Sequence, residues 1–382
     1  MGIELDRAQG QIRRAATEFA RGEFDREEIR ELEKVGEFPT RIWKAAAELG
    51  FLGLHLDEAG GGILESLITA EAFCREDSAC GMALTLAGCG AELVRALGNP
   101  DQKAAVVEPV TLGAARCGAA LFEPGRSLED CHTRARPDGS GWIISGEKTQ
   151  VANGLSVAGE TLFFPVLCRA PEGPTLVLLD ARTPGVGLSP TVRRLGNNLS
   201  PSAEMVLEDV RVRANQILGK PGKAWKPVQA FLDQLQLLNA GMALGMAQGA
   251  LDRALAYGKQ RQQFGRPVLA FEALAHTLAE MELRLGTARS LVYDMARAWD
   301  SRKKNPPAGA ALAMEAACRA AEYCADAALQ IHGGYGYMTE GEIEQFYRDA
   351  KWLKLHATNP AQRLSAIAAA RIGTLKPGPG KE

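Results

Sequence analysis

The pattern of apolar residues changes character twice along the chain, and this order of segments limits the possible folds. From about residue 3 to 115, apolar residues recur at helical spacing, as they do between Ile12 and Ala20. From about 116 to 215, short apolar runs are bounded by Gly and Pro, which is typical of a small all-β domain. Long helical patterns return beyond Gly219.

Two helical zones therefore flank a strand-rich zone, and we predict an α+β fold in three parts. We expect a helical domain over 1–115, a β domain over 116–220, a helical bundle over 221–375 and a tail over 376–382. Long helices with short connections favour a four-helix bundle in the third part. The expected helices include 64–76, 79–97, 226–258, 268–302, 308–331, 342–355 and 360–373.

The charge balance argues against a nucleic-acid partner. The 382 residues include 44 Lys and Arg against 46 Asp and Glu, and no long basic run occurs. The N-terminus lacks the charged-then-apolar pattern of a secretion signal. We see no apolar run close to the roughly 18 residues of a membrane span. A cytoplasmic protein without a membrane span is expected.

Neither the cysteines nor the histidines suggest a metal site. The eight Cys form no Cys-x-x-Cys pair, and the five His show no ligand spacing. We expect buried, reduced thiols and no metal.

The segment from Tyr257 to Pro267 contains the first candidate binding motif. Arg261 is a cation suited to a phosphate group, and Phe264 is an aromatic contact. Gly265 and Pro267 also allow a plain structural interpretation, in which the segment only connects two helices.

The second motif runs from Gln330 to Tyr337. Its glycines Gly333 and Gly334 would let the backbone lie directly against a bulky planar ligand. A Gly-rich helix end is the structural alternative.

The two motifs, about seventy residues apart, together resemble those of the acyl-CoA dehydrogenase family. Similarities at 98–103, 146–148 and 207–212 extend the resemblance over nearly the whole chain. It implies an N-terminal helical domain, a middle β-barrel and a C-terminal four-helix bundle that mediates tetramer formation. It also implies FAD bound between subunits, with five residues on the adenosine side of the cofactor: Arg261, Phe264, Gln330, Gly333 and Gly334.

The same resemblance implies an acyl-CoA or related thioester as substrate and an electron-transfer flavoprotein as electron acceptor. In the family, a Glu removes the α-proton while a hydride passes to the flavin. That Glu falls on Ala357 in this chain, and Ala cannot accept a proton. The alternative register, on the first bundle helix, falls near Leu235, with Asp233 on a different helix face.

Residues expected near the flavin ring also depart from the family pattern. Phe122 replaces a Thr before Glu123-Pro124, and Ala152 replaces a hydroxyl residue expected near the flavin N5. The adenosine-side motifs are kept, whereas the ring-side groups and the base are lost.

Three hypotheses follow for the activity. The chain is an FAD-dependent oxidoreductase with a displaced base, for which Glu92 and His356 are candidates, although Glu92 also fits a solvated charge on a helix face. Alternatively, it is a catalytically idle partner of a related, intact subunit in a heteromeric acyl-CoA dehydrogenase. A homo-oligomer, or a hetero-oligomer with a related subunit, is expected. A flavin oxidase or monooxygenase relative would need no α-proton base.

Overall fold

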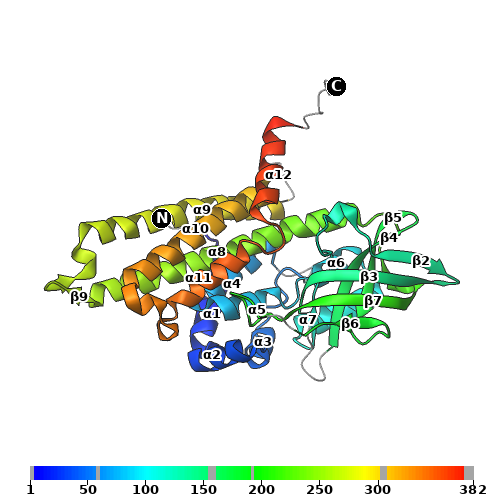
Figure 1. Cartoon of the computed structure of the whole chain (residues 1–382), viewed down its shortest axis with the longest axis horizontal. Helices are drawn as coiled ribbons and strands as arrows, with labels where there is room; N and C mark the ends of the chain where they lie inside the picture. Colours follow the sequence, from blue (N-terminus) through cyan, green and yellow to red (C-terminus); the bar gives the residue numbers. More distant parts are fainter. Residues whose placement is uncertain (1–3, 57–60, 154–160, 191–192, 302–307, 374–382) are drawn as a thin grey trace.

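The computed structural model describes residues 4–56, 61–153, 161–190, 193–301 and 308–373. It has an N-terminal group of helices, a central sheet and a C-terminal helical bundle, in the order that the sequence predicts (Figure 1). The long helices of the bundle extend away from the sheet, which lies at one end of the molecule. The predicted tail over 376–382 lies outside the described residues.

Seven helices precede the sheet in the described part of the chain. Short polar side chains begin four of them, because Asp6, Asp25, Asp77 and Asn99 each accept a hydrogen bond from a backbone N–H of the first helical turn. The helices are α1 (Arg7–Glu23), α2 (Arg26–Val35), α3 (Thr40–Glu48), α4 (Ile63–Glu76), α5 (Ser78–Leu86), α6 (Ala91–Leu97) and α7 (Pro100–Thr111).

The prediction of one helix over 79–97 is wrong, because the chain forms α5 and α6 with a break between them. The first strand lies against this break. Cys117 donates its N–H to the carbonyl of Ala87 and accepts a hydrogen bond from the N–H of Gly90. A Cβ atom on Gly90 would lie only 1.8 Å from the carbonyl oxygen of Gly118. The glycine therefore lets a strand approach where helix hydrogen bonds would otherwise continue.

The central sheet has eight strands, and their order along its main path is β6-β7-β3-β2-β4-β5-β8, with β1 pairing β4. Buried and exposed residues alternate along β7, so one face of this strand packs on the core. The strands are β1 (Ala115–Cys117), β2 (Arg134–Asp138), β3 (Gly141–Ala152), β4 (Thr161–Ala170), β5 (Gly173–Asp180), β6 (Val186–Leu188), β7 (Ser202–Arg213) and β8 (Ile217–Leu218).

The C-terminal helices match the predicted ranges closely. They are α8 (Trp225–Gln260), α9 (Glu272–Asp300), α10 (Gly309–His332), α11 (Ile343–Leu353) and α12 (Pro360–Ile372). A short hairpin of β9 (Gln262–Gln263) and β10 (Arg266–Pro267) joins α8 to α9.

Three glycines on one face of α8 bring this helix close to α4. A Cβ atom on Gly241, Gly245 or Gly249 would lie 2.4 to 2.7 Å from an atom of Leu67, Glu71 or Arg75, respectively. The bundle and the N-terminal helices therefore share one continuous core.

One stretch, 78–97, has the length and composition of a membrane-spanning helix, with a mean hydropathy of 1.3. The expectation that no run approaches this length is therefore wrong on composition alone. Because 72% of the apolar window is buried inside the protein, as in many core helices, the stretch is weak evidence for a span.

All eight cysteines are free and buried, which confirms the prediction of reduced thiols that pack as small apolar side chains. Within the described residues, no group of three or more His, Cys, Asp or Glu side chains is arranged to hold a metal ion.

Candidate functional site

A cavity of about 240 Å³ lies where the end of β3 meets the end of α11. We call it the ring-side cavity, because it is lined by Ala152 and by His356, the neighbour of Ala357, and both segments are expected beside a flavin ring. None of the described residues that line it is Asp or Glu. The lining residues are Leu86, Gln150, Ala152, Arg194, Asn197, Ser200, Ser202, Trp352, Leu355 and His356.

The wall from β3 is held in place by Asn153. This buried side chain donates hydrogen bonds of 3.0 Å to the carbonyls of Leu86 and Ala87 at the end of α5. Thr149 donates its N–H to the carbonyl of Phe122, so the strand carrying Ala152 runs beside the segment before Glu123-Pro124. Both departures from the family pattern therefore lie on adjacent segments.

The opposite wall is formed by the segment after α11. His356 stacks on Trp352 with 4.6 Å between the ring centroids, and its Nδ1 lies 3.1 Å from Nδ2 of Asn239 on α8. Burial, together with the nearby Arg194 charge, lowers the pKa of His356 to about 4. His356 is therefore neutral near pH 7 and is a weak general base.

Ala357 is buried beside His356, with a left-handed φ of 64°. Arg363 on α12 holds this segment. Its Nε lies 3.0 Å from a carboxylate oxygen of Glu315, and its Nη1 donates to the carbonyls of Lys354 and Thr358. A buried ion pair between α10 and α12 thus positions the residues on both sides of Ala357.

Polar atoms without hydrogen-bond partners gather along the third wall, in the loop 193–200. The buried side chains of Asn197 and Ser200 have unpartnered amide and hydroxyl atoms, and the Nε atom of Arg194 is also buried and unpartnered. Buried polar groups are normally hydrogen-bonded. These atoms therefore indicate that the cavity is built to receive a polar ligand.

Backbone strain supports the same interpretation. Four non-glycine residues in or next to the cavity wall have left-handed φ angles between 54° and 64°. Strained conformations of this kind persist mainly where function requires them. The four residues are Gln150, Asn153, Asn197 and Ala357.

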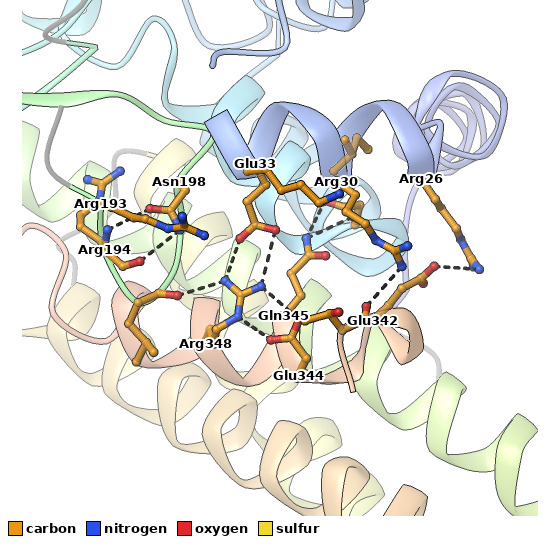
Figure 2. A pocket seen from close by; sticks show the side chains of 15 residues that line it. Arg26, Arg30, Glu33, Arg193, Arg194, Asn198, Glu342, Glu344, Gln345 and Arg348 are labelled. Atoms are coloured by element: carbon orange, nitrogen blue, oxygen red, sulfur yellow. Dashed lines mark hydrogen bonds and ion pairs between the residues drawn. The ribbon is translucent and has the colours of Figure 1, made fainter. Parts of the chain in front are cut away.

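A second, surface-exposed hollow of about 420 Å³ lies beside the cavity, between α2 and α11, and Arg194 lines both. Figure 2 shows its charged side chains, with Arg348 at the centre. Arg348 forms ion pairs with Glu33 at 2.7 Å and with Glu344 at 2.5 Å. Arg348 thus pairs with one acid on α2 and with one on its own helix, α11.

Asp349 points instead into the protein and is fully buried. It accepts hydrogen bonds from the Ser78 hydroxyl at 2.6 Å and from the Asn197 N–H at 2.7 Å. Burial, reinforced by the charge of Glu33, raises the pKa of Asp349 to about 7.

The residues predicted to hold the adenosine side lie at the far end of the bundle from the sheet (Figure 1). The guanidinium of Arg261 lies 5.5 Å from the centroid of the Tyr335 ring, so the two sequence motifs meet there. Arg261, Gln330, Gly333 and Gly334 are all exposed. We call this group, together with Phe264, the adenosine handle.

Phe264 is the most distinctive residue of the handle. It is 93% exposed at the tip of the β9–β10 hairpin, and both Phe264 and Gly265 have positive φ angles, of 52° and 75°. Positive φ angles at both positions fit the turn of a two-residue hairpin. A large apolar residue is strained in this conformation, and the Phe264 side chain stays in contact with water. The sequence reasoning found this residue through its motif.

The two acids considered as displaced bases lie elsewhere. Glu92 is only 6% exposed and pairs with Arg95, so the solvated alternative is wrong; it does not line the ring-side cavity. Asp233 also lies outside the cavity lining, as does the buried Leu235. Sequence reasoning missed Arg194, Asn197 and Ser200, because only the fold brings their loop to the cavity.

Comparison with known proteins decides the family. The acyl-CoA dehydrogenase N-terminal domain model matches residues 6–114, and the C-terminal domain model matches 222–368. A probable acyl-CoA dehydrogenase, YngJ, of Bacillus subtilis is 32% identical over 95% of this chain and 98% of its own length. The chain belongs to the acyl-CoA dehydrogenase family.

Similar proteins also include a reductase and a second dehydrogenase. A 3-(aryl)acrylate reductase of Clostridium sporogenes is 32% identical over 92% of this chain and 96% of its own length. Butyryl-CoA dehydrogenase from Megasphaera elsdenii shares the fold with a TM-score of 0.90 and 26% identity, covering 97% of this chain and all of that one. As a member of the acyl-CoA dehydrogenase family, this protein is a flavoprotein oxidoreductase. The predicted fold is confirmed.

Proposed function

We propose that this protein catalyses flavin-dependent oxidoreduction of an acyl-CoA thioester, with FAD held between two chains. One observation carries the proposal. Segments near residues 152 and 357, far apart in the sequence, converge on one strained cavity with unpartnered polar atoms. These are the segments that the family places beside the flavin ring.

The need for two chains follows from distance along the molecule. The ring-side cavity lies where β3 meets α11, whereas the adenosine handle lies at the other end of the bundle. One chain therefore presents the two groups at different ends of the bundle. We infer that the handle of one chain completes the site of another.

When bound, the flavin accepts or returns a hydride. The chain's own residues enclose and orient it: Leu86 and Trp352 offer apolar surface, while Asn197 and Ser200 offer hydrogen-bonding groups. His356 stays neutral and holds a fixed ring orientation through Asn239. No carboxylate among the described lining residues is available to take an α-proton.

The test is the flavin content of the purified protein, followed by reduction with a panel of acyl-CoA thioesters. We expect a yellow protein with about one FAD per chain. Bleaching of the flavin absorbance by saturated acyl-CoA, or reoxidation of the reduced protein by enoyl-CoA, would establish the reaction direction. A colourless protein, whether made alone or with a related subunit, would contradict the proposal.

The absence of a carboxylate favours a second candidate, an idle subunit that supplies only its adenosine handle to a related, intact chain. Co-expression with such a chain distinguishes the two. The idle-subunit hypothesis predicts no flavin in the isolated protein and about one FAD per pair of chains in the mixed assembly. An isolated protein that binds flavin at full occupancy would exclude it.

A further inference from the structure

We propose that Arg194 sets the reduction potential of the bound flavin by stabilising its reduced, negatively charged form. The inference rests on the proposed function, since it assigns a role to one wall of the ring-side cavity. It concerns a residue that the family resemblance did not single out and that no sequence motif marks.

The side chain of Arg194 is held rigidly. Its Nη2 donates hydrogen bonds to the carbonyls of Asn197 and Ser200, and its guanidinium carbon lies 5.5 Å from the centroid of the Trp352 ring. The backbone of the same residue exchanges hydrogen bonds with the Asn198 side chain. A cation fixed at both ends of its side chain cannot swing out to the solvent without losing these contacts.

One donor of this fixed group is unused. The Nε atom of Arg194 is buried and has no hydrogen-bond partner among the described residues, although a guanidinium normally satisfies its donors. Arg194 lines the ring-side cavity beside Asn197 and Ser200, whose side-chain polar atoms are likewise unpartnered. Because Arg194 lines the cavity, its positive charge acts on any ligand bound there.

The charge of Arg194 is poorly balanced by the protein. Its partners are neutral carbonyls, and the acid whose charge acts on it is Asp349. Because the pKa of Asp349 is itself raised to about 7, this carboxyl is only partly ionised near neutral pH. In Figure 2, Arg193 lies at the same end of the charged hollow as Arg194 and carries a second positive charge there.

An electropositive wall has a definite consequence for a flavin. An oxidised flavin that takes up two electrons and one proton gains one negative charge, which a nearby cation stabilises. The oxidised ring is neutral, so the same cation stabilises it less. Arg194 therefore shifts the equilibrium towards the reduced flavin, and it does so whichever thioester is the substrate.

The experiment measures the ratio of reduced to oxidised flavin at a fixed solution potential, using a reference dye, in the FAD-loaded protein. We expect Arg194→Gln to lower this ratio at least tenfold. The matched control is Arg193→Gln, which removes the neighbouring charge from the surface hollow but not from the cavity. It should change the ratio less than about twofold, because a solvated charge is screened.

Equal shifts in the two variants, or no shift in Arg194→Gln, would overturn the inference. If Arg194→Gln fails to retain FAD, Arg194→His replaces it. This variant should match the wild-type ratio at pH 5.5, where an ordinary His is charged, and fall at least tenfold below it at pH 8.5. A constant difference from wild type at both pH values would contradict the role of charge. Absence of flavin from the wild-type protein would instead refute the proposed function.

Discussion

At the scale of single residues, no carboxylate lines the ring-side cavity among the described residues, and the backbone beside it is strained. Ala357, where the family resemblance predicts the catalytic Glu, has a left-handed backbone conformation that costs an L-residue about 1 kcal/mol. The neighbouring His356 is neutral and paired with Asn239. The backbone of a ligand-binding segment is thus preserved although its usual base is absent.

Restoring the acid alone should not create activity. In Ala357→Glu, the new carboxylate enters a site that still has Ala152 in the cavity wall, and Phe122 on the adjacent segment, in place of the expected hydroxyl residues. We expect no bleaching of bound flavin by any acyl-CoA that leaves the wild-type protein unchanged. Ala357→Gly is the matched control for backbone conformation. Brisk turnover in the Glu variant would show that this view of the flavin side is wrong.

The buried Asp349 should make the stability of the protein depend on pH. Its pKa rises from 3.8 when unfolded to about 7 when folded, so the folded protein binds this proton more tightly. The resulting stability is present below pH 3.8 and is lost as the pH rises through about 7.

Asp349→Asn mimics the protonated acid, because its amide can donate to Ser78 and accept from the Asn197 N–H. Between pH 5 and pH 8, the free energy of unfolding of this variant should rise relative to wild type by about 2–3 kcal/mol. Urea unfolding at both pH values measures it. In the control variant Asp101→Asn, at an exposed site, the difference in unfolding free energy from wild type should not change between the two pH values. The same result for Asp349→Asn would refute the assignment.

At the scale of elements, one strand decides how a long apolar segment folds. The backbone of Cys117 in β1 hydrogen-bonds to residues at the break between α5 and α6. The same break presents the carbonyls of Leu86 and Ala87 to Asn153, which fixes the end of β3 at the cavity. The helix break thus links the N-terminal helices to the site.

Gly90→Ala should therefore destabilise the protein strongly. Its φ of −70° suits Ala, but the added Cβ would lie 1.8 Å from the Gly118 carbonyl oxygen. We expect a loss of about 3 kcal/mol or more in the free energy of unfolding, with reduced flavin content. Gly286→Ala, in α9 with nothing within 4 Å, is the control and should be neutral or slightly stabilising. Similar stability of both variants would contradict this account of the break.

At the scale of the whole molecule, the two halves of the predicted FAD site lie at opposite ends of the bundle (Figure 1). The exposed faces support association. Leu364 and Ile372 on α12 are 46% and 61% exposed, and α12 projects from the rest of the chain in Figure 1. An assembly that covers these residues would remove their apolar surface from water.

This arrangement predicts complementation between two defective chains. Ala152→Trp should fill the ring-side cavity, and Arg261→Ala with Phe264→Ala should remove the handle. Each variant alone should bind little flavin. Co-expressed and purified through tags on both chains, they should bind about one FAD per mixed dimer, since one of its two sites is intact. Co-expression of two differently tagged handle variants is the control, and it should recover none.

Equal flavin recovery in that control would show that FAD binding does not need the handle. No recovery in the mixed pair would show that each chain binds FAD by itself or not at all. The handle variants should keep the wild-type stability, because Arg261 and Phe264 are exposed and contribute little to the core.

Periodicity alone determined the order of helices, strands and helices and the bounds of α8 to α12, because long repeats of apolar residues report directly which face of an element is buried. The motifs with Arg261 and Gln330 identified the family, and the structure places both at one end of the bundle. The loss of the acid at position 357 stays a prediction from the family resemblance.

Tertiary structure alone decided the rest. The helix break at Gly90 depends on a strand that follows it in the chain, and local propensity carries no information about that contact. Ion-pair partners depend on the tertiary arrangement: Arg348 pairs with Glu33 and Glu344 and not with its sequence neighbour Asp349. Arg194 has no distinguishing sequence context, and only the packing of its loop against Trp352 turns an ordinary arginine into a wall of the cavity.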